Sequence, residues 1–352
     1  MRLKALALQQ FRSYETASFE FTTPLTVVLG PNASGKSNFL EAVSLIATGK
    51  SFHAEHDTEM IRFGQEVGRV KASIVGTDDE STTLELVVAS LAGRITKRFL
   101  VNDIPRRRVD FAGRLPAVLF LPSDLEIIVG SPGMRRRFLD SILEQTDRGY
   151  RIHLTAYEKA LRRRNKLLEQ AREAGHRDER LFSYWDELLV THGQAITKAR
   201  ETFITFINTT QQTVFPVSLI YNASLMSVER LLQYKDAEIG AGVTLVGPHR
   251  DDFIVQMQHS ETKQIERIKQ FGSRGQQRLA VLQLKVLQIA YLEQETQGRP
   301  LLLLDDIFSE LDAGHMRLLS EIIAGQQTII TTTHKEFLKS LTIATPQIIE
   351  LM

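Results

Sequence analysis

The fold is decided by the stretch Gly30-Pro31-Asn32-Ala33-Ser34-Gly35-Lys36-Ser37, which fits the phosphate-binding pattern G-x-x-x-x-G-K-[ST] in full. It follows the apolar run 25–29 and precedes the helix-like run 38–43, as this pattern requires. The glycines let the backbone curl so that its amide hydrogens face phosphates, and the following helix adds the positive end of its dipole. A glycine-rich turn that matches by chance is the alternative, and this setting disfavours it.

The pattern also assigns roles within the loop. Lys36 is expected to reach the β- and γ-phosphates of ATP and to assist catalysis, and the Ser37 hydroxyl is expected to hold Mg²⁺. The residues of this region predicted to bind the nucleotide are Gly30, Asn32, Ala33, Ser34, Gly35, Lys36, Ser37 and Asn38. The sequence therefore predicts ATP and Mg²⁺ as cofactors.

A second motif is the apolar run 301–304, followed by Asp305 and Asp306. Carboxylates at the carboxyl end of a strand lie where open α/β sheets bind ligands. We expect Asp305 to hold Mg²⁺, directly or through water, and Asp306 to position the attacking water. ABC-type ATPases usually carry a glutamate at the second position, so the shorter aspartate predicts slow hydrolysis. The alternative is that the two acids merely cap a loop.

Between these motifs, Phe271-Gly272-Ser273-Arg274-Gly275-Gln276 precedes an expected helix over 276–295 and resembles the ABC signature L-S-G-G-Q. Ser273, Gly275 and Gln276 match, whereas Arg274 replaces the first glycine. A serine hydroxyl, a glycine amide and a helix N-terminus together make an anion site. In ABC-type ATPases this site faces the nucleotide of the other subunit, so the resemblance implies a homodimer that forms when ATP binds.

Three more segments follow the ABC motif order. Residues 309–312, with Asp312 at the nucleotide, resemble the loop that crosses the dimer axis. His334 follows the apolar run 328–331 and resembles the catalytic histidine that senses the γ-phosphate, although a lone histidine is more often structural. After the apolar run 117–121 there is no glutamine, so ligation of Mg²⁺ from that side is in doubt.

The spacing of apolar residues changes along the 352-residue chain. Residues 1–134 and 243–352 are rich in strand-like runs, whereas 135–242 carries apolar residues mostly at helical spacing, with Gly175 and Asp178 between two long expected helices. We therefore predict an α/β ABC-type ATPase head, with a mixed sheet and the phosphate loop, into which an all-helical arm of residues 135–242 is inserted.

Composition narrows the class of protein. The chain has no cysteine, which excludes disulfides, thiolate metal sites and a cysteine nucleophile. It shows neither a signal-peptide core nor an apolar run near the roughly 20 residues that span a bilayer. We expect a soluble, cytoplasmic protein that does not associate with membranes.

Positive charge is local, because the net charge of the whole chain is only +1. Residues 135–182 hold 13 Lys and Arg against 8 Asp and Glu, and residues 94–114 hold 7 against 2. Such patches suit phosphate binding, although solvated helix faces often look the same. The residues expected to contact DNA are Arg106, Arg107, Arg108, Arg162, Arg163 and Arg164.

The combination resembles the RecF family, bacterial DNA replication and repair ATPases related to the heads of SMC proteins. The segments that carry the resemblance are Phe11-Arg12-Ser13-Tyr14, 30–37, Gly49-Lys50-Ser51-Phe52, 122–140, Gly247-Pro248-His249-Arg250-Asp251-Asp252-Phe253, 272–278 and 302–312. They span almost the whole chain in family order. His53 departs from the pattern, because an arginine is expected there.

This resemblance implies a cytoplasmic protein that dimerises with ATP, binds double-stranded and gapped DNA, and works beside RecO and RecR in loading RecA. By analogy with related heads, Arg12 and Ser13 would approach the phosphates of the ATP in their own subunit. Hydrolysis would then release the dimer and reset it.

Three alternative functions stay open at this point: a transport ATPase subunit, a metabolic P-loop kinase and another SMC-like head ATPase. A transport ATPase subunit would share the motifs, but should have the missing glutamine and a short helical subdomain in place of the basic arm. A metabolic P-loop kinase has no place for the signature, the 309–312 loop or His334.

Overall fold

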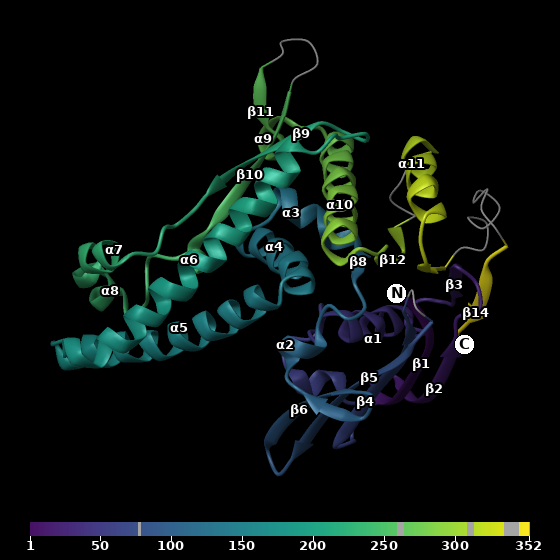
Figure 1. The fold of residues 1–352 in the computed structure, drawn as a ribbon, viewed down its shortest axis with the longest axis horizontal. Coiled ribbons are helices and arrows are strands. Elements are labelled where there is room, and N and C mark those ends of the chain that lie inside the picture. The colour runs from purple at the N-terminus through teal and green to yellow at the C-terminus, as the bar shows by residue number, and fades with distance from the viewer. Residues whose placement is uncertain (77–78, 259–263, 308–312, 334–344, 352) are drawn as a thin grey trace. The chain divides into compact units, whose positions relative to one another are not determined.

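A computed structural model describes residues 1–76, 79–258, 264–307, 313–333 and 345–351. The chain divides into two compact units (Figure 1). The first comprises Met1–Asp124 and Gln288–Met352, and the second comprises Leu125–Leu287. Among the helices of the described residues, none has the length and apolar character to cross a membrane.

The first unit contains a parallel sheet in the order β14-β3-β13-β12-β8. Its strands are β3 (Leu25–Leu29), β8 (Ala117–Phe120), β12 (Leu301–Asp305), β13 (Thr328–Thr332) and β14 (Gln347–Glu350). Every residue of β3 and β13 is buried, which explains why these strands read as continuous runs of apolar and β-branched residues. The apolar runs 25–29, 117–121, 301–304 and 328–331 of the sequence thus correspond to β3, β8, β12 and β13.

A second, antiparallel sheet of this unit has the order β2-β1-β4-β5-β6-β7. Its strands are β1 (Arg2–Phe11), β2 (Tyr14–Glu20), β4 (Val67–Val75), β5 (Ser81–Leu91), β6 (Arg94–Val101) and β7 (Ile104–Arg106). Burial alternates along β4, because successive side chains of a strand point to opposite faces. One face of the sheet therefore packs into the core.

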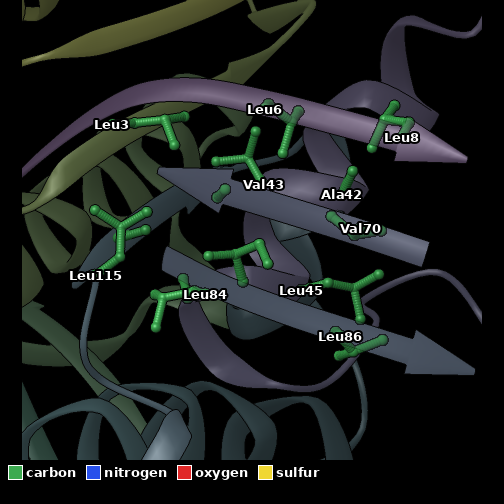
Figure 2. Packing of buried hydrophobic residues seen from close by; sticks show 14 of the residues in the cluster. Leu3, Leu6, Leu8, Ala42, Val43, Leu45, Val70, Leu84, Leu86 and Leu115 are labelled. Atoms are coloured by element: carbon green, nitrogen blue, oxygen red, sulfur yellow. The ribbon is translucent and has the colours of Figure 1, made fainter. Parts of the chain in front are cut away.

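Helix α1 (Lys36–Thr48) is the centre of that core, because it contacts strands of both sheets. Leu6 of β1, Val70 of β4 and Leu86 of β5 form one buried cluster with Val43 and Leu45 of α1 (Figure 2). Packing on both sides fixes the helix, and with it the loop at its N-terminal end. The remaining short elements of the unit are η1 (Asp57–Met60), α2 (Arg108–Phe111), η2 (Pro122–Leu125) and α11 (Ala313–Ala324).

The second unit is mainly helical. Its elements are α3 (Glu126–Val129), α4 (Pro132–Thr146), α5 (Arg148–Ala174), α6 (Glu179–Thr209), α7 (Val228–Gln233), α8 (Lys235–Ala241), η3 (Pro248–Arg250), α9 (Ile268–Phe271) and α10 (Arg274–Thr296), which continues into the first unit. Helices α5 and α6 lie side by side (Figure 1).

The turn between α5 and α6 lies where the sequence predicts it. Gly175 follows α5 with a φ of 71°, a conformation that glycine adopts without a Cβ clash. Asp178 caps α6 by accepting a hydrogen bond from the Arg180 amide at 3.1 Å. The Arg177 guanidinium lies 3.9 Å from the ring centre of Phe182 and closes the turn.

The predicted α/β architecture with a helical arm is confirmed, with two differences. The stretch 135–242, expected to be all helical, contains the strand β9 (Val217–Asn222). This strand pairs with β10 (Asp252–Gln258), which in turn pairs with β11 (Ile265–Arg267). Because this pairing joins segments on both sides of residue 242, residues 243–287 belong to the same compact unit as the arm, not to the head as predicted.

Candidate functional site

The phosphate loop joins β3 to α1 with a left-handed backbone at two positions. Gly35, immediately before α1, has a φ of 96°, and Ala33 has a φ of 67°. A Cβ on Gly35 would stand 2.9 Å from the Ser13 hydroxyl, so only glycine fits. Among the described residues, no side chain caps the N-terminus of α1. Its first amide groups are therefore available to an anion, as the sequence predicts.

Lys36 shapes this loop from inside. Its ammonium donates hydrogen bonds to the carbonyl oxygens of Gly30 at 2.8 Å and Pro31 at 2.7 Å. The loop is therefore curled around the charge that would meet a β- or γ-phosphate. The buried Ser34 hydroxyl has no hydrogen-bond partner among the described residues, so it can donate to a phosphate oxygen. Asn32 lies exposed on the same loop.

The two predicted metal ligands lie together. The Ser37 hydroxyl is 3.4 Å from Oδ1 of Asp305, although the two residues are far apart in the chain. Thr331 of β13 donates to the same carboxylate oxygen at 2.6 Å and fixes its orientation. In the described ranges no group of three or more acidic or histidine side chains could hold a metal alone. A Mg²⁺ here would take its remaining ligands from phosphate and water, as this ion usually does.

Asp306 directly follows β12 with a strained backbone. Its φ is 45°, a left-handed conformation that costs on the order of 1–3 kcal/mol for a residue other than glycine. Its amide donates to the Thr331 carbonyl at 3.1 Å, which helps to hold that conformation. Asp306 therefore lies at the carboxyl end of the parallel sheet beside Asp305, and its catalytic role stays a prediction.

The turn between β1 and β2 closes over the loop. The Ser13 hydroxyl accepts a hydrogen bond from the side-chain amide of Asn38 at 3.0 Å, and the Tyr14 hydroxyl donates to the Gly35 carbonyl at 3.1 Å. Burial raises the pKa of Tyr14 to about 12, so this hydroxyl remains a donor at neutral pH. Ser13 thus lies next to the loop, its contact with phosphate stays a prediction, and Tyr14 is a contact that sequence reasoning missed.

Arg12 lies in the same turn, and its guanidinium is bound to Glu41 of α1. Nε and Nη2 donate to the two carboxylate oxygens, each at 2.8 Å. Sequence reasoning also missed Glu41, although a carboxylate inside the apolar run 39–43 is a usable signal: a buried charge needs a partner.

The signature residues form the start of α10. The Ser273 amide donates to Oε1 of Gln276 at 2.8 Å, and the Gln276 amide donates to the Ser273 hydroxyl at 3.2 Å. This reciprocal pair is a capping box. Ser273, Arg274 and Gly275 are exposed, and an added Cβ on Gly275 would meet nothing closer than 4.0 Å. The helix start is therefore capped by its own residues and exposed.

Two predicted positions, Asp312 and His334, lie outside the described residues, as does the whole of the 309–312 loop. The segment after β8 is η2, where the Asp124 carboxylate accepts from the Leu121 amide at 2.7 Å. The carboxylate therefore caps this turn at the place where a glutamine is expected in ABC-type ATPases.

The arginines expected to contact DNA are placed differently from one another. Arg106, Arg162 and Arg163 are exposed, and Arg107 is exposed with an ion pair to Asp110 at 3.3 Å. Arg108 is half-buried and donates to the Thr48 carbonyl at 3.3 Å.

For Arg164 the DNA-contact prediction is wrong, because its side chain is 0% exposed. It forms ion pairs with Asp186 at 2.5 Å and Glu238 at 2.7 Å. In three consecutive helical arginines the side chains point in directions about 100° apart, so they cannot all face solvent on a packed helix.

The segment 247–253 contributes to a buried network in the second unit. Arg200 of α6 donates to Asp140 at 2.7 Å and to Asp251 at 2.9 Å, and Asp251 also accepts from Tyr221. Burial, and then the charge of Asp140, raise the pKa of Tyr150, which donates to Asp140 at 2.5 Å. This network joins α4, α5, α6 and β9, and sequence reasoning did not find it.

Residues 2–346 match the family described as RecF/RecN/SMC N terminal domain. A protein of Cyanothece sp., "DNA replication and repair protein RecF", is 35% identical over an alignment of 376 positions, which covers 100% of this chain and 96% of that protein. The chain belongs to the RecF family. Another RecF, from Lachnoclostridium phytofermentans, is 35% identical over 96% of this chain and 94% of its own.

Solved structures agree with this assignment. A structure described as the recombination mediator protein RecF-ATP in the RecFOR pathway aligns with a TM-score of 0.84 and 30% identity, over 95% of this chain and 92% of that one. An SMC head bound to a domain of ScpA aligns with a TM-score of 0.50 and 16% identity, which shows the fold alone. RecF proteins are ABC-type ATPases, so membership supports ATP as the ligand and excludes the transport-subunit and metabolic-kinase alternatives.

Proposed function

We propose that this chain is an ATP-dependent DNA-binding protein of recombinational repair, and a slow, DNA-dependent ATPase. The observation that carries the proposal is the site built by Lys36, Ser37 and Asp305. Three features of this site suit a nucleoside triphosphate with Mg²⁺. The loop curls around a lysine, the first amides of the following helix are uncapped, and the Ser37 hydroxyl lies 3.4 Å from the Asp305 carboxylate. The ATP bound by the related RecF structure supports the same ligand.

ATP is proposed to close a homodimer. The exposed start of α10, with Ser273, Gly275 and Gln276, would contact the γ-phosphate of ATP held by the loop of a second copy. A ligand that makes all of its contacts only in the dimer shifts the association equilibrium toward the dimer. Ligand at 100 times its dissociation constant stabilises the state that it binds by about 2.7 kcal/mol.

Hydrolysis would open the dimer again. Asp306, with Lys36 and His334, would position and sense the attack of water on the γ-phosphate, and Asp312 would touch the shared nucleotide. Because an aspartate reaches one methylene less far than a glutamate, turnover is proposed to be slow. Loss of the γ-phosphate removes the contact that joins the two copies.

The dimer is proposed to bind double-stranded and gapped DNA through phosphates, without strong sequence preference. The exposed Arg106, Arg107, Arg162 and Arg163 support this role. By kinship with RecF proteins of the RecFOR pathway, we further propose that it acts in the cytoplasm with RecO and RecR to promote RecA loading.

The test of the nucleotide site is Lys36→Met, which keeps the length of the side chain and removes its charge. Calorimetric titration with ATP and Mg²⁺ should show binding to the unchanged protein and at least a 100-fold loss in the variant. Lys50→Met, a change of an exposed lysine just after α1, is the matched control and should bind normally. Equal affinity in Lys36→Met would contradict the proposed site.

A further inference from the structure

Glu41 is a buried carboxylate next to the nucleotide site. It lies on α1 one turn after Ser37, and only 1% of its side chain is exposed. An ionised carboxylate at such a place requires a charged partner and further hydrogen bonds. Both oxygens accept from the Arg12 guanidinium at 2.8 Å, in the paired geometry that fixes an arginine most firmly.

Glu41 also accepts a third hydrogen bond, from a different segment. The Ser51 hydroxyl donates to its Oε1 at 2.5 Å. The same hydroxyl oxygen accepts from the backbone amides of His53 at 2.9 Å and Ala54 at 2.7 Å. A continuous series of hydrogen bonds therefore runs from Arg12 through Glu41 and Ser51 to the backbone of residues 53–54.

The other end of this series touches the phosphate loop. Arg12 is followed by Ser13, which accepts from Asn38, and by Tyr14, which donates to the Gly35 carbonyl. Arg12 itself has a φ of 51°, so the turn is strained and depends on its contacts. Any movement of this turn when phosphates enter the loop acts directly on the Arg12–Glu41 pair.

We propose that Glu41 is a positioning residue that holds the turn 12–14 against the phosphate loop and transmits nucleotide binding to the segment Ser51–Ala54. The inference rests on the proposed nucleotide site. The guanidinium has five donors, of which Nε and one hydrogen of Nη2 serve Glu41. A phosphate that draws on the guanidinium weakens its hold on Glu41, and the change passes through Ser51 to the amides of residues 53 and 54.

Two variants separate the two halves of this proposal. Glu41→Gln keeps the shape and removes the charge that orients Arg12. The KM for ATP should rise about tenfold while kcat stays within about twofold, because the turn 12–14 is no longer held in the conformation that binds phosphate. Ser51→Ala keeps the Arg12–Glu41 pair and should leave KM for ATP unchanged.

The transmission is read by hydrogen exchange of the His53 and Ala54 amides with and without saturating ATP and Mg²⁺. In the unchanged protein ATP should alter their exchange rate severalfold, and both variants should lose this response. Glu15→Gln is the matched control, because it removes an exposed carboxylate of β2 that forms an ion pair with Arg62. It should behave like the unchanged protein.

The outcomes are distinct. If the unchanged protein binds ATP but the two amides do not respond, or if Glu41→Gln keeps both the KM and the response, the inference is wrong and the nucleotide site stands. If Glu41→Gln fails to fold, Ser51→Ala alone decides the transmission. If the unchanged protein does not bind ATP, the proposed function and this inference fail together.

Discussion

His249 should make the stability of the second unit depend on pH. It lies in η3, where Nε2 donates to the Thr244 carbonyl at 3.0 Å, so the neutral ring accepts from the Tyr157 hydroxyl through Nδ1 at 2.7 Å. A protonated ring would leave that hydroxyl without its acceptor. Burial first, and then the positive charges of Arg250, Arg136 and Arg164, lower the pKa of His249 from 6.5 to about 4, against the hydrogen bond to Thr244, which raises it.

The sign of the effect follows from proton uptake. Between pH 6.5 and 4 the unfolded chain binds a proton at this histidine and the folded chain does not, so stability falls as pH falls through this window. The full difference in pKa corresponds to about 3 kcal/mol. Between pH 7 and pH 5, about 2 kcal/mol of this should be lost.

Urea unfolding followed by tryptophan fluorescence can measure this loss, because the single tryptophan, Trp185, lies on α6 of the second unit. His249→Gln keeps an amide donor and an acceptor at this position but does not titrate. From pH 7 to pH 5 it should lose about 2 kcal/mol less than the unchanged protein. His176→Gln, at an exposed histidine of the same unit, is the control. Equal losses in the His249 variant and the unchanged protein would refute the reasoning.

Four further changes test the dimer, catalysis, the DNA contacts and the burial of Arg164 separately. Ser273→Arg should leave ATP binding to the monomer nearly unchanged in calorimetry while preventing the dimer; a variant that dimerises normally would contradict a site shared between two copies. Asp306→Asn should lower phosphate release by at least about tenfold and accumulate the ATP-bound dimer, and rapid turnover would remove Asp306 from catalysis. The double change Arg162→Ala and Arg163→Ala should reduce the slope of log affinity for duplex DNA against log salt by about 1–2 without changing stability. Arg164→Ala should instead cost about 3–5 kcal/mol in urea unfolding, because it leaves Asp186 and Glu238 unpaired.

The sequence predicts the local structure around residues 30–37 well, because this motif encodes local geometry. The pattern of residues 30–37 requires a strand, a tight loop and a helix, and β3, Gly35 and α1 provide them. Asp305 also follows from its motif, since the carboxyl ends of parallel strands meet at one edge of the sheet.

The features that the sequence could not predict depend on contacts between residues that are distant in the chain. Arg164 reads like its exposed neighbours, and only the packing of Asp186 and Glu238 around it shows that it is buried. The Arg12–Glu41 pair and the network around Arg200 likewise join separate elements. β9 is missed because it is a short run next to long helices in the sequence. Its pairing with β10, and not the local sequence pattern, makes it a strand.

The central claim is that ATP becomes part of the interface between two copies of this chain. Sedimentation velocity, with and without ATP and Mg²⁺ and then with a gapped DNA duplex, tests it most directly. The account predicts a monomer without nucleotide, a dimer with ATP, and association of that dimer with the duplex. An unchanged sedimentation coefficient and unchanged DNA binding on addition of ATP would contradict it.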